Sequence, residues 1–580
     1  MTATGIIPLL TNVCAYALLA MCYFGAGWIC SRLMGININH ENKYFSLIWT
    51  GWAITLLISQ VWHLLFPINI YLSISILLPG FIATAGYWIP NFRSTHTSAA
   101  PRLYWALLIL AALWIANQSM LPPTDYDSGL YHFNTVRWLN EHPIVLGLGN
   151  LHGRLAFNQS LLVYVASLNF YPVFNHGYNL ANSFLWLLLF AECLWYAIRV
   201  FGAKNPTTGF STIEILIVLL IPVLIFLSVY SSVSSPAPDL ASSILQILIF
   251  IYFMRSLSMD EQAFATQGVS FVTFLLVITA AAITVKLSNL FYVLSVCAVL
   301  FFVHRGSLRR LLKETPIFVV KVIALPVLIL TVWGFRGVLL SGCPAYPSTV
   351  GCIQTAWSAP IEAVKTEADW VYSWARAPHE QPEIVFGSWD WFIPWLFRTI
   401  LSNSVRVVYP LFLFLAIELV GLRSYYAHRS IGLAANRNWV LVPVPVLVGL
   451  IFWFLVAPDL RFAHALFWIL PISATALFIR ILDGTGKLRR PVVLLLFFIL
   501  NASIAQIFVQ DPQIRIAPDG YMPIPVRVAN LTEKTTVSGL KILVPIKGDQ
   551  CWDSRIPCTP YFNAQLRFSD TPFFPRFTIR

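Results

Sequence analysis

Long apolar stretches separated by short polar segments run through most of the chain. Each apolar stretch has roughly 16 to 25 residues, the length that an α-helix needs to cross the hydrocarbon core of a bilayer. About fourteen such stretches can be placed. The pattern predicts an all-α polytopic membrane protein with transmembrane helices near residues 7–30, 46–66, 70–90, 104–121, 179–200, 213–233, 239–255, 269–285, 289–304, 316–339, 404–421, 439–457, 462–480 and 492–509.

The composition supports this class and excludes a soluble globular protein. Apolar residues make up 58% of the chain and charged residues 11%, and the mean hydropathy is +0.72. The formal net charge of +12 would suit a nucleic-acid partner. The basic residues, however, lie in short loops between apolar stretches, where membrane orientation explains them. We therefore expect the membrane as a partner and no nucleic acid.

Basic residues mark every second connection between the predicted spans, and the intervening turns have few of them. By the positive-inside rule the basic connections are cytoplasmic, and both termini lie outside. The N-terminal segment has no charged region before its apolar stretch, so we expect a retained helix rather than a cleaved signal. The basic connections contain Arg32, Lys43, Arg93, Arg102, Arg199, Lys204, Arg255, Arg305, Arg309, Arg310, Lys313, Arg423, Arg429, Arg437, Arg480, Lys487, Arg489 and Arg490.

This orientation divides the chain into membrane and extracytoplasmic parts. Residues 160–174 are apolar but too short to cross, which predicts an interfacial helix or a re-entrant segment. Alternating apolar and polar residues after Lys541 predict a small β-rich cap in the tail. The parts are transmembrane helices 1–121, a first large outer loop 122–178 with interfacial helices, transmembrane helices 179–339, a second large outer loop 340–403, transmembrane helices 404–510 and an extracytoplasmic tail 511–580.

The nine cysteines fall into two groups. Those inside apolar stretches are most simply small buried side chains. Cys343 with Cys352, and Cys551 with Cys558, are closely spaced in polar segments on the predicted outer side, where local disulfides can form. Zinc binding is the alternative, but neither pair has further Cys or His at ligand spacing.

The first outer loop gathers ionisable residues beside a membrane face. Asp125 and Asp127 follow a Pro-Pro break and precede a predicted helix over 129–139. One aspartate would be enough to cap that helix. Two of them, followed by Tyr131 and His132, favour a general base or ligands of a divalent metal ion.

The sequence Asp127-Ser-Gly-Leu-Tyr131-His132 resembles the acidic motif in the first outer loop of many-spanning glycosyltransferases of the GT-C class. The resemblance implies that a sugar moves from a polyprenyl-phosphate donor to an envelope lipid or polysaccharide at the periplasmic face of a bacterial inner membrane. It implies that Asp127 takes the acceptor's proton, helped by Asp125 or by Mg²⁺ or Mn²⁺ bound to both. The usual acidic pair is Asp-Glu, whereas here Ser128 follows Asp127.

The same resemblance implies inversion at the anomeric carbon of the sugar, because the acceptor attacks from the face opposite the phosphate. A second resemblance is to a family of largely uncharacterised bacterial polytopic membrane proteins. It rests on Asp-Ser-Gly-Leu-Tyr-His, on Tyr346-Pro-Ser, on Pro458-Asp-Leu-Arg-Phe462 and on the Cys551-Trp-Asp and Pro-Cys558 pair of the tail. This second resemblance implies kinship and adds no chemistry.

Cationic residues at the predicted outer ends of spans are the candidate ligands of a donor phosphate. They are Lys286, Arg336, Arg398, Arg406 and Arg461. Basic residues are scarce on that side, so each calls for a counter-charge, and guanidinium groups bind phosphate in a bidentate way. The alternatives are ion pairs with nearby aspartates, lipid headgroups, or side chains that reach the interface.

Four other residues complete the predicted substrate site. Tyr131, His132 and Arg137 accompany the two aspartates in the first outer loop. Asp239 lies at the outer mouth of the next helix pair, where it either caps the helix or contacts the substrate. In the second outer loop, the acids Glu362, Glu367 and Asp369 could face an acceptor, and its tryptophans could stack on sugars or anchor the loop at the interface.

A transporter or lipid flippase is the alternative function, and a non-catalytic subunit of envelope assembly is a third. Glu192, Glu418 and Lys321 lie within predicted spans, as proton-coupled transport would require. The sequence lacks a convincing internal repeat, which counts against transporters built from duplicated halves. It also lacks a P-loop or Gly-rich dinucleotide turn, so we expect no soluble nucleotide site.

Overall fold

The computed structural model describes most of the chain. Most of the predicted span near 404–421 and all of that near 492–509 lie outside the described residues, as do Arg406 and Glu418. The described residues are 3–35, 42–91, 101–202, 211–230, 233–259, 261–314, 316–403, 407–408, 412, 415, 441–482, 526–570 and 574–579.

Eight of the described helices are long and apolar enough to cross a membrane, which supports a multi-pass membrane protein. These eight helices are α1 (Ala3–Met34), α2 (Lys43–His63), α3 (Ile70–Asn91), α7 (Tyr178–Gly202), α8 (Thr212–Tyr230), α9 (Pro238–Ser258), α11 (Leu290–Glu314) and α12 (Pro316–Ser341). Four more helices fall on predicted spans, namely α4 (Arg102–Ser119), α10 (Glu261–Val285), α17 (Val444–Val456) and α18 (His464–Leu482). Every predicted span within the described residues therefore coincides with a helix.

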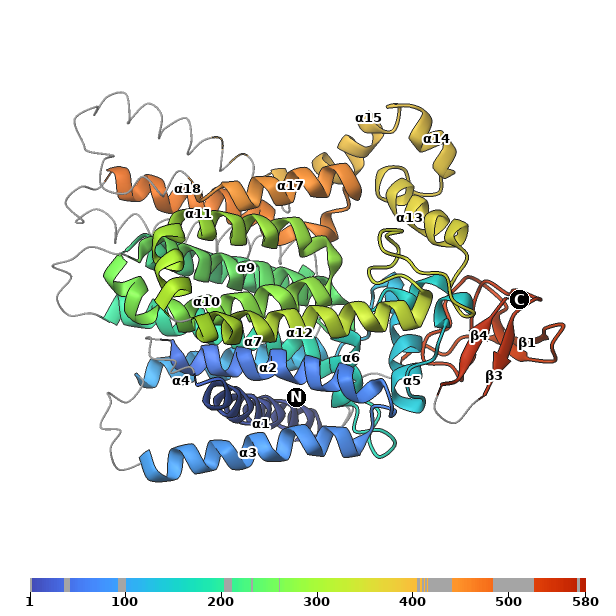
Figure 1. Ribbon diagram of the computed structural model, residues 1–580, viewed down its shortest axis with the longest axis horizontal. Helices are drawn as coiled ribbons and strands as arrows, with labels where there is room; N and C mark the ends of the chain where they lie inside the picture. The colour runs from blue at the N-terminus through green and yellow to red at the C-terminus, as the bar shows by residue number, and fades with distance from the viewer. Residues whose placement is uncertain are drawn as a thin grey trace.

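The long helices run side by side along the long axis of the molecule (Figure 1). Helix α9 is the most enclosed of the eight. In its most apolar stretch 94% of the residues are buried, against 28% in the corresponding stretches of α3 and α12. The exposed residues of α3 and α12 include large apolar side chains such as Tyr71, Ile82 and Val327. Apolar side chains that point outward suit helices that face lipid. The bundle thus has a protein-enclosed centre and an apolar rim.

Helices α1 and α2 approach each other closely through glycines. A Cβ atom on Gly51 would overlap the carbonyl oxygen of Tyr23, and one on Gly27 would overlap that of Leu47. Small residues allow this distance between backbones, as is common where helices pack in membranes.

One end of the bundle carries the short helices of both predicted outer loops and all the described strands, and we call it the loop-rich end (Figure 1). The first loop contains η1 (Ser128–His132), α5 (Phe133–Glu141), η2 (Leu148–Asn150), η3 (Gly153–Ala156) and α6 (Ser160–Leu168). The second contains α13 (Ile361–Arg376), α14 (Pro382–Gly387), α15 (Phe392–Trp395), η5 (Leu396–Ile400) and η6 (Leu401–Asn403). Two short turns, η4 (Leu287–Asn289) and η10 (Leu460–Phe462), lie at ends of the long helices.

Helix α6 distinguishes between the two alternatives predicted for residues 160–174. All nine of its residues are buried, and it packs against α2, α5 and α7. A helix lying in the membrane interface would expose one face. The segment is therefore enclosed by protein, which the re-entrant alternative allows and the interfacial one does not.

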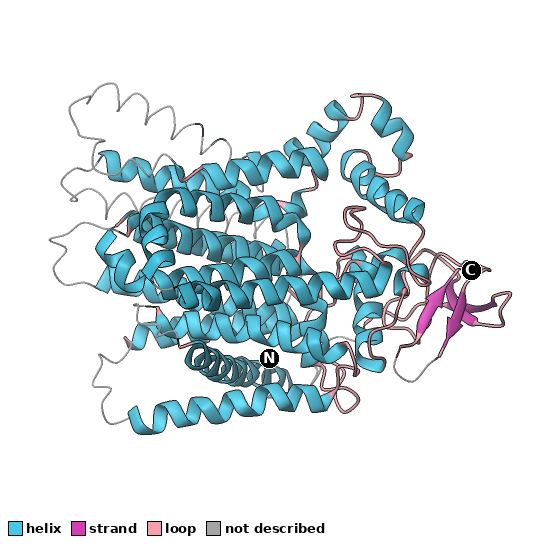
Figure 2. Cartoon of the chain, viewed as in Figure 1, coloured by secondary structure: helices cyan, strands magenta, loops and turns pink. Residues whose placement is uncertain are grey.

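The tail forms the predicted β-rich cap (Figure 2). Strands β1 (Leu531–Thr535) and β2 (Lys541–Pro545) pair antiparallel, as do β3 (Arg567–Ser569) and β4 (Arg576–Thr578). The backbone of Leu146 pairs with β4, since its N–H donates to Pro575 and its carbonyl accepts from Phe577. A shared apolar core that includes Tyr131, Val364 and Val544 joins the cap to both loops.

Both predicted disulfides are present, Cys343–Cys352 in the second loop and Cys551–Cys558 in the cap. The zinc alternative is therefore wrong for these four cysteines.

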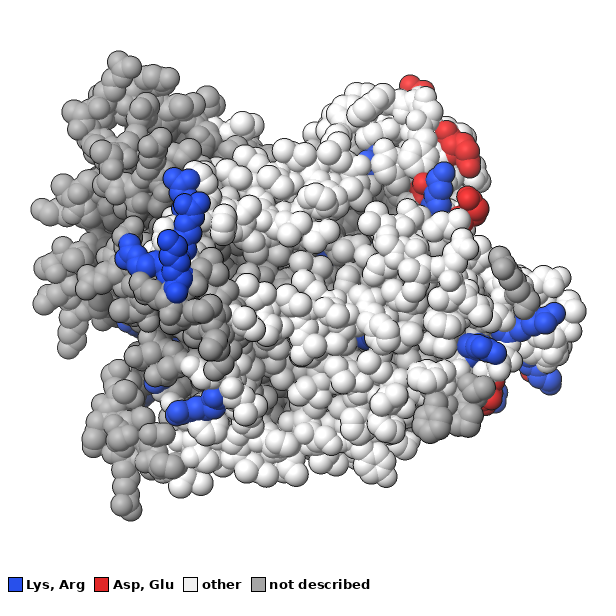
Figure 3. Space-filling model, viewed as in Figure 1, with Lys and Arg blue, Asp and Glu red and all other residues white. Residues whose placement is uncertain are grey.

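The two ends of the molecule differ in charge. At the end opposite the cap, the charged residues in view are basic, whereas the cap end carries both signs (Figure 3). Exposed Arg305, Arg309 and Arg310 belong to the basic end.

Candidate functional site

Asp127 lies directly before η1 and between two arginines. Its Oδ2 atom is 2.7 Å from Nη1 of Arg461, and its Oδ1 atom is 3.4 Å from Nη1 of Arg154. Asp127 and Arg461 are 334 residues apart in the chain. The Asp127 side chain makes no hydrogen bond to the start of η1, so the capping alternative is wrong for this residue. The predicted convergence of this carboxylate with a cationic helix end is confirmed.

The two arginines extend the charged network to other segments. Nε of Arg154 is 3.1 Å from Oε1 of Glu367 on α13. Nε of Arg461 is 3.5 Å from Oδ2 of Asp459, whose carboxylate also accepts the backbone N–H of Arg461 at 3.1 Å. The alternating charges tie η3, the second loop and η10 to the acidic motif.

A second ion pair lies beside this network. Asp239, in the first turn of α9, pairs with Nζ of Lys286. The N-cap of α9 is Ala237, so the capping alternative is wrong for Asp239 as well. Nζ of Lys286 lies 4.1 Å from the centre of the Phe462 ring, and Cζ of Arg461 lies 5.0 Å from the same ring. Both cations therefore lie against one aromatic ring.

Asp125 differs from its neighbours because it forms no ion pair among the described residues. Burial and then the charge of Asp239 raise the pKa of Asp125 to about 6, and a hydrogen bond from Ser235 opposes this rise. Such a carboxyl group changes charge near neutral pH, which suits proton transfer.

The pKa of Asp127 moves in the opposite direction. Burial would raise the pKa of Asp127, but Arg461, followed by His132 and Arg154, outweighs burial and lowers it. Burial lowers the pKa of His132 to about 4, so its imidazole is neutral at neutral pH. Asp127 therefore remains ionised between its arginines and holds them in place.

The cap holds the acidic motif from the other side. The backbone N–H of Trp552 donates to the carbonyl of Gly129 at 2.8 Å, and Nε2 of Gln550 donates to the carbonyl of Tyr126 at 2.8 Å. A Cβ atom on Gly129 would lie 2.5 Å from Cε2 of Trp552, so only glycine fits there. Buried Tyr131 accepts a hydrogen bond from Gln159 at 3.4 Å.

Three other predicted cations form no ion pair with the network in the described residues, and each has partners of its own. Nε of Arg137 is 2.7 Å from Oε1 of Glu141, and its Nη1 donates to the carbonyl of Asp553 in the cap. Arg336 contacts His63 and Asn158, and Nη2 of Arg398 donates to the carbonyl of Arg376. The last predicted cation, Arg406, lies outside the described residues.

Sequence reasoning did not single out Arg154, and it named Glu367 only as one of three acids in the second loop. Arg154 lies in the same polar stretch as the aspartates, which was the available signal. Its pairing with both Asp127 and Glu367 follows only from the fold.

A divalent metal ion does not fit this arrangement well. In the described ranges, no group of three or more His, Cys, Asp and Glu side chains could hold a metal ion. The carboxylates of Asp127 and Asp239 face guanidinium and ammonium groups instead. No chemical step is therefore assigned to a metal here.

Glu192 lies elsewhere, on α7, and is 1% exposed. Its Oε1 accepts hydrogen bonds from Asn42 at 2.7 Å and Tyr252 at 3.0 Å, and it pairs with Arg255 at 3.4 Å. These contacts fix the carboxylate within the bundle and tie α7 to α9, a structural role.

The matched family covers most of the chain and the whole charged network. Residues 9–468 match the family described as "Domain of unknown function (DUF8201)", a range that includes the acidic motif, Asp239, Lys286 and Arg461 and stops before the cap. No curated protein and no solved structure matches the chain. The chain belongs to this family of domains of unknown function, DUF8201.

Proposed function

We propose that this protein is a GT-C-like membrane glycosyltransferase. It would transfer a sugar from a polyprenyl-phosphate donor to an envelope lipid or polysaccharide, at the periplasmic face of a bacterial inner membrane. The observation that supports this proposal is the meeting of Asp125, Asp127 and Asp239 with Arg154, Lys286 and Arg461 at the loop-rich ends of apolar helices. Charges in such a place commonly serve function.

Arg461 and Lys286 are the proposed phosphate ligands. The side chain of Arg461 is 39% exposed, so it can meet a ligand while it stays paired with Asp127. Lys286 and Arg461 lie against the same ring, that of Phe462. Fixed cations at the phosphate stabilise the negative charge that it gains as the leaving group.

Asp125 is the proposed general base. Both oxygens of Asp127 face guanidinium groups, so its role is to position Arg154 and Arg461. The acceptor's hydroxyl oxygen attacks the anomeric carbon while its proton passes to Asp125. The bond from the anomeric carbon to the phosphate oxygen breaks, and its electron pair leaves with the phosphate. Attack from the opposite face inverts the anomeric configuration.

The test is sugar transfer by the full-length protein in nanodiscs. The substrates are a panel of radiolabelled polyprenyl-phosphate hexoses and pentoses, with envelope glycolipid and polysaccharide fractions as acceptors. We expect Asp125→Asn to lower the transfer rate at least 100-fold, the lower range for a general base. Glu141→Gln is the matched control, because Glu141 pairs only with Arg137 in the ion pairs of the described part.

Equal product formation by the wild type, Asp125→Asn and Asp127→Asn would overturn the proposal. Movement of intact donor across the bilayer without any transfer product would instead support the transporter or flippase alternative.

A further inference from the structure

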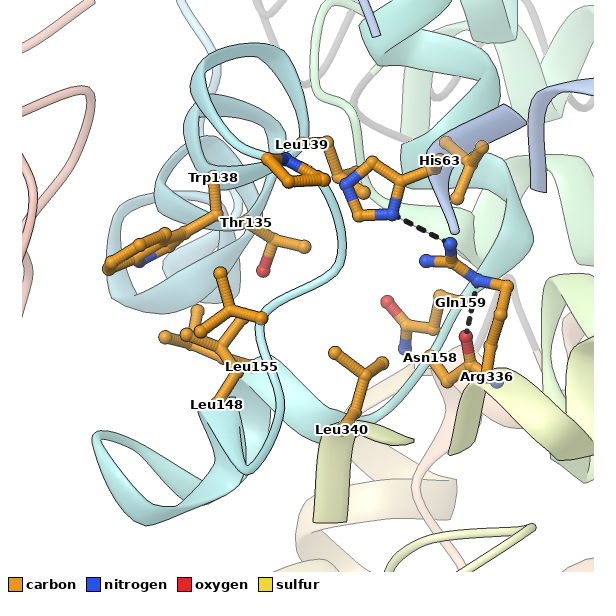
Figure 4. A pocket seen from close by; sticks show the side chains of 13 residues that line it. His63, Thr135, Trp138, Leu139, Leu148, Leu155, Asn158, Gln159, Arg336 and Leu340 are labelled. Atoms are coloured by element: carbon orange, nitrogen blue, oxygen red, sulfur yellow. Dashed lines mark hydrogen bonds between the residues drawn. The ribbon is translucent and has the colours of Figure 1, made fainter. Parts of the chain in front are cut away.

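Arg336 is a buried cation without an acidic partner in the described part of the chain. It lies on α12 near the loop-rich end and is 2% exposed. Its Nη1 is 2.8 Å from Nδ1 of His63, and its Nε donates to Oδ1 of Asn158 at 3.3 Å (Figure 4). Both acceptors are neutral, so neither cancels the charge.

Two other arginines of the described ranges, the half-buried Arg255 and the buried Arg376, are compensated. Arg255 pairs with Glu192. Arg376 lacks a carboxylate, but its two terminal nitrogens donate to the carbonyl oxygens of Tyr372, Phe454, Leu455 and Val456. Four carbonyl dipoles stabilise a guanidinium that is removed from water. Arg336 has no comparable set, which leaves a buried charge that calls for a counter-ion.

A small cavity adjoins Arg336. Its volume, measured as the space open to the centre of a water molecule, is about 20 Å³, which is enough for one water molecule or one small ion. Its wall includes the Gln159 amide, Thr135 and the apolar side chains of Leu148 and Leu340 (Figure 4). The Oε1 atom of Gln159 is buried without a hydrogen-bond partner, while its Nε2 donates to the Tyr131 hydroxyl at 3.4 Å. With the amide turned, its NH₂ group faces the cavity and its oxygen accepts from the Tyr131 hydroxyl instead.

We propose that this cavity binds a small inorganic anion of the size of chloride, which compensates the charge of Arg336. The cation, the turned amide and the apolar wall supply charge, a hydrogen-bond donor and exclusion of water. The bound anion stabilises the junction of α2, the first loop and α12, because His63, Asn158 and Arg336 come from these three segments. The site is separate from the proposed donor site, since Arg336 pairs with none of its carboxylates.

The experiment measures thermal unfolding of the full-length protein in nanodiscs. Sodium chloride, sodium bromide and sodium gluconate are compared at equal ionic strength. An anion that binds only the folded state raises the apparent melting temperature. We expect chloride and bromide to raise it by about 2 °C over gluconate, the shift for a modest linkage free energy in a large chain.

Two variants assign the effect to the cavity. Arg336→Met removes the cation, and Leu340→Phe fills the cavity while Arg336 stays. Both should abolish the difference between chloride and gluconate, and Arg376→Met, the matched control, should keep it. If Arg336→Met does not fold, Leu340→Phe carries the test. Equal melting temperatures of the wild type in the three salts, or a halide effect that persists in Leu340→Phe, would overturn the proposal.

Discussion

Replacing Gly129 with alanine should separate the cap from the acidic motif. The added Cβ would lie 2.5 Å from Cε2 and 2.8 Å from Cζ2 of Trp552, and 2.9 Å from Cδ of Gln550. Trp552 is 6% exposed, and its backbone N–H donates to the carbonyl of Gly129 at 2.8 Å. Displacement of the whole residue from Gly129 would break that hydrogen bond, and the buried ring has little room to turn away on its own. Overpacking of this kind costs about 1–3 kcal/mol, and a lost hydrogen bond adds about 1 kcal/mol.

The assay is thermal and denaturant unfolding of Gly129→Ala in nanodiscs, followed by tryptophan fluorescence. Gly86→Ala is the matched control, because a Cβ at Gly86 meets nothing within 4 Å and the residue lies inside α3. Alanine in a helix interior is favoured over glycine by roughly 0.5–1 kcal/mol, so this control should be neutral or stabilising. The double variant Gly129→Ala/Trp552→Leu should recover part of the loss, because a smaller side chain makes room for the Cβ.

Unchanged stability of Gly129→Ala would refute the close packing of Trp552 on the motif. So would strictly additive effects in the double-mutant cycle, because residues in contact show a coupling free energy of about 0.5–3 kcal/mol.

Three further predictions concern the site and the cap. Since the pKa of Asp125 is raised to about 6 and the base must be ionised, transfer should fall as the pH drops through about 6, and a flat pH–rate profile would contradict that role. Arg461→Lys keeps the charge but removes the bidentate guanidinium, so KM for the donor should rise about tenfold, which corresponds to the loss of one charge-assisted hydrogen bond. An unchanged KM would argue against phosphate binding by Arg461. Replacing Cys551 and Cys558 with serine should lower the free energy of unfolding by about 2–3 kcal/mol. A reductant should then have no effect on the stability of the cap, which unfolding with and without reductant would show.

The sequence predicted the helices and the cap well because their signals are local. A span is recognised from the length of one apolar stretch, and each such stretch in the described residues is a helix. The helix expected over 129–139 is present as η1 followed by α5. The disulfides were predictable because their cysteines are only 9 and 7 residues apart.

The site was predicted only in part. Asp127 and Arg461 were both named, and they meet; Arg336 and Arg398 were named on the same grounds and do not join them. A cation at a helix end cannot reveal its partner, because that partner comes from another part of the chain. The position of α6 was left open between two alternatives for a similar reason, since a short and mostly apolar segment suits a surface and an enclosed site equally.

The length of the apolar stretches, the basic loops and the cysteine spacing were enough to predict a helical membrane-spanning protein with a disulfide-bonded cap and an acidic motif. The tertiary structure decided which charges pair: it placed Arg154 and Arg461 on Asp127, Lys286 on Asp239, and left Asp125 and Arg336 without a counter-charge in the described residues. The physical reason is range. Hydrophobic length acts within one segment, whereas an ion pair requires two side chains within about 4 Å, a condition that only packing of distant segments can satisfy.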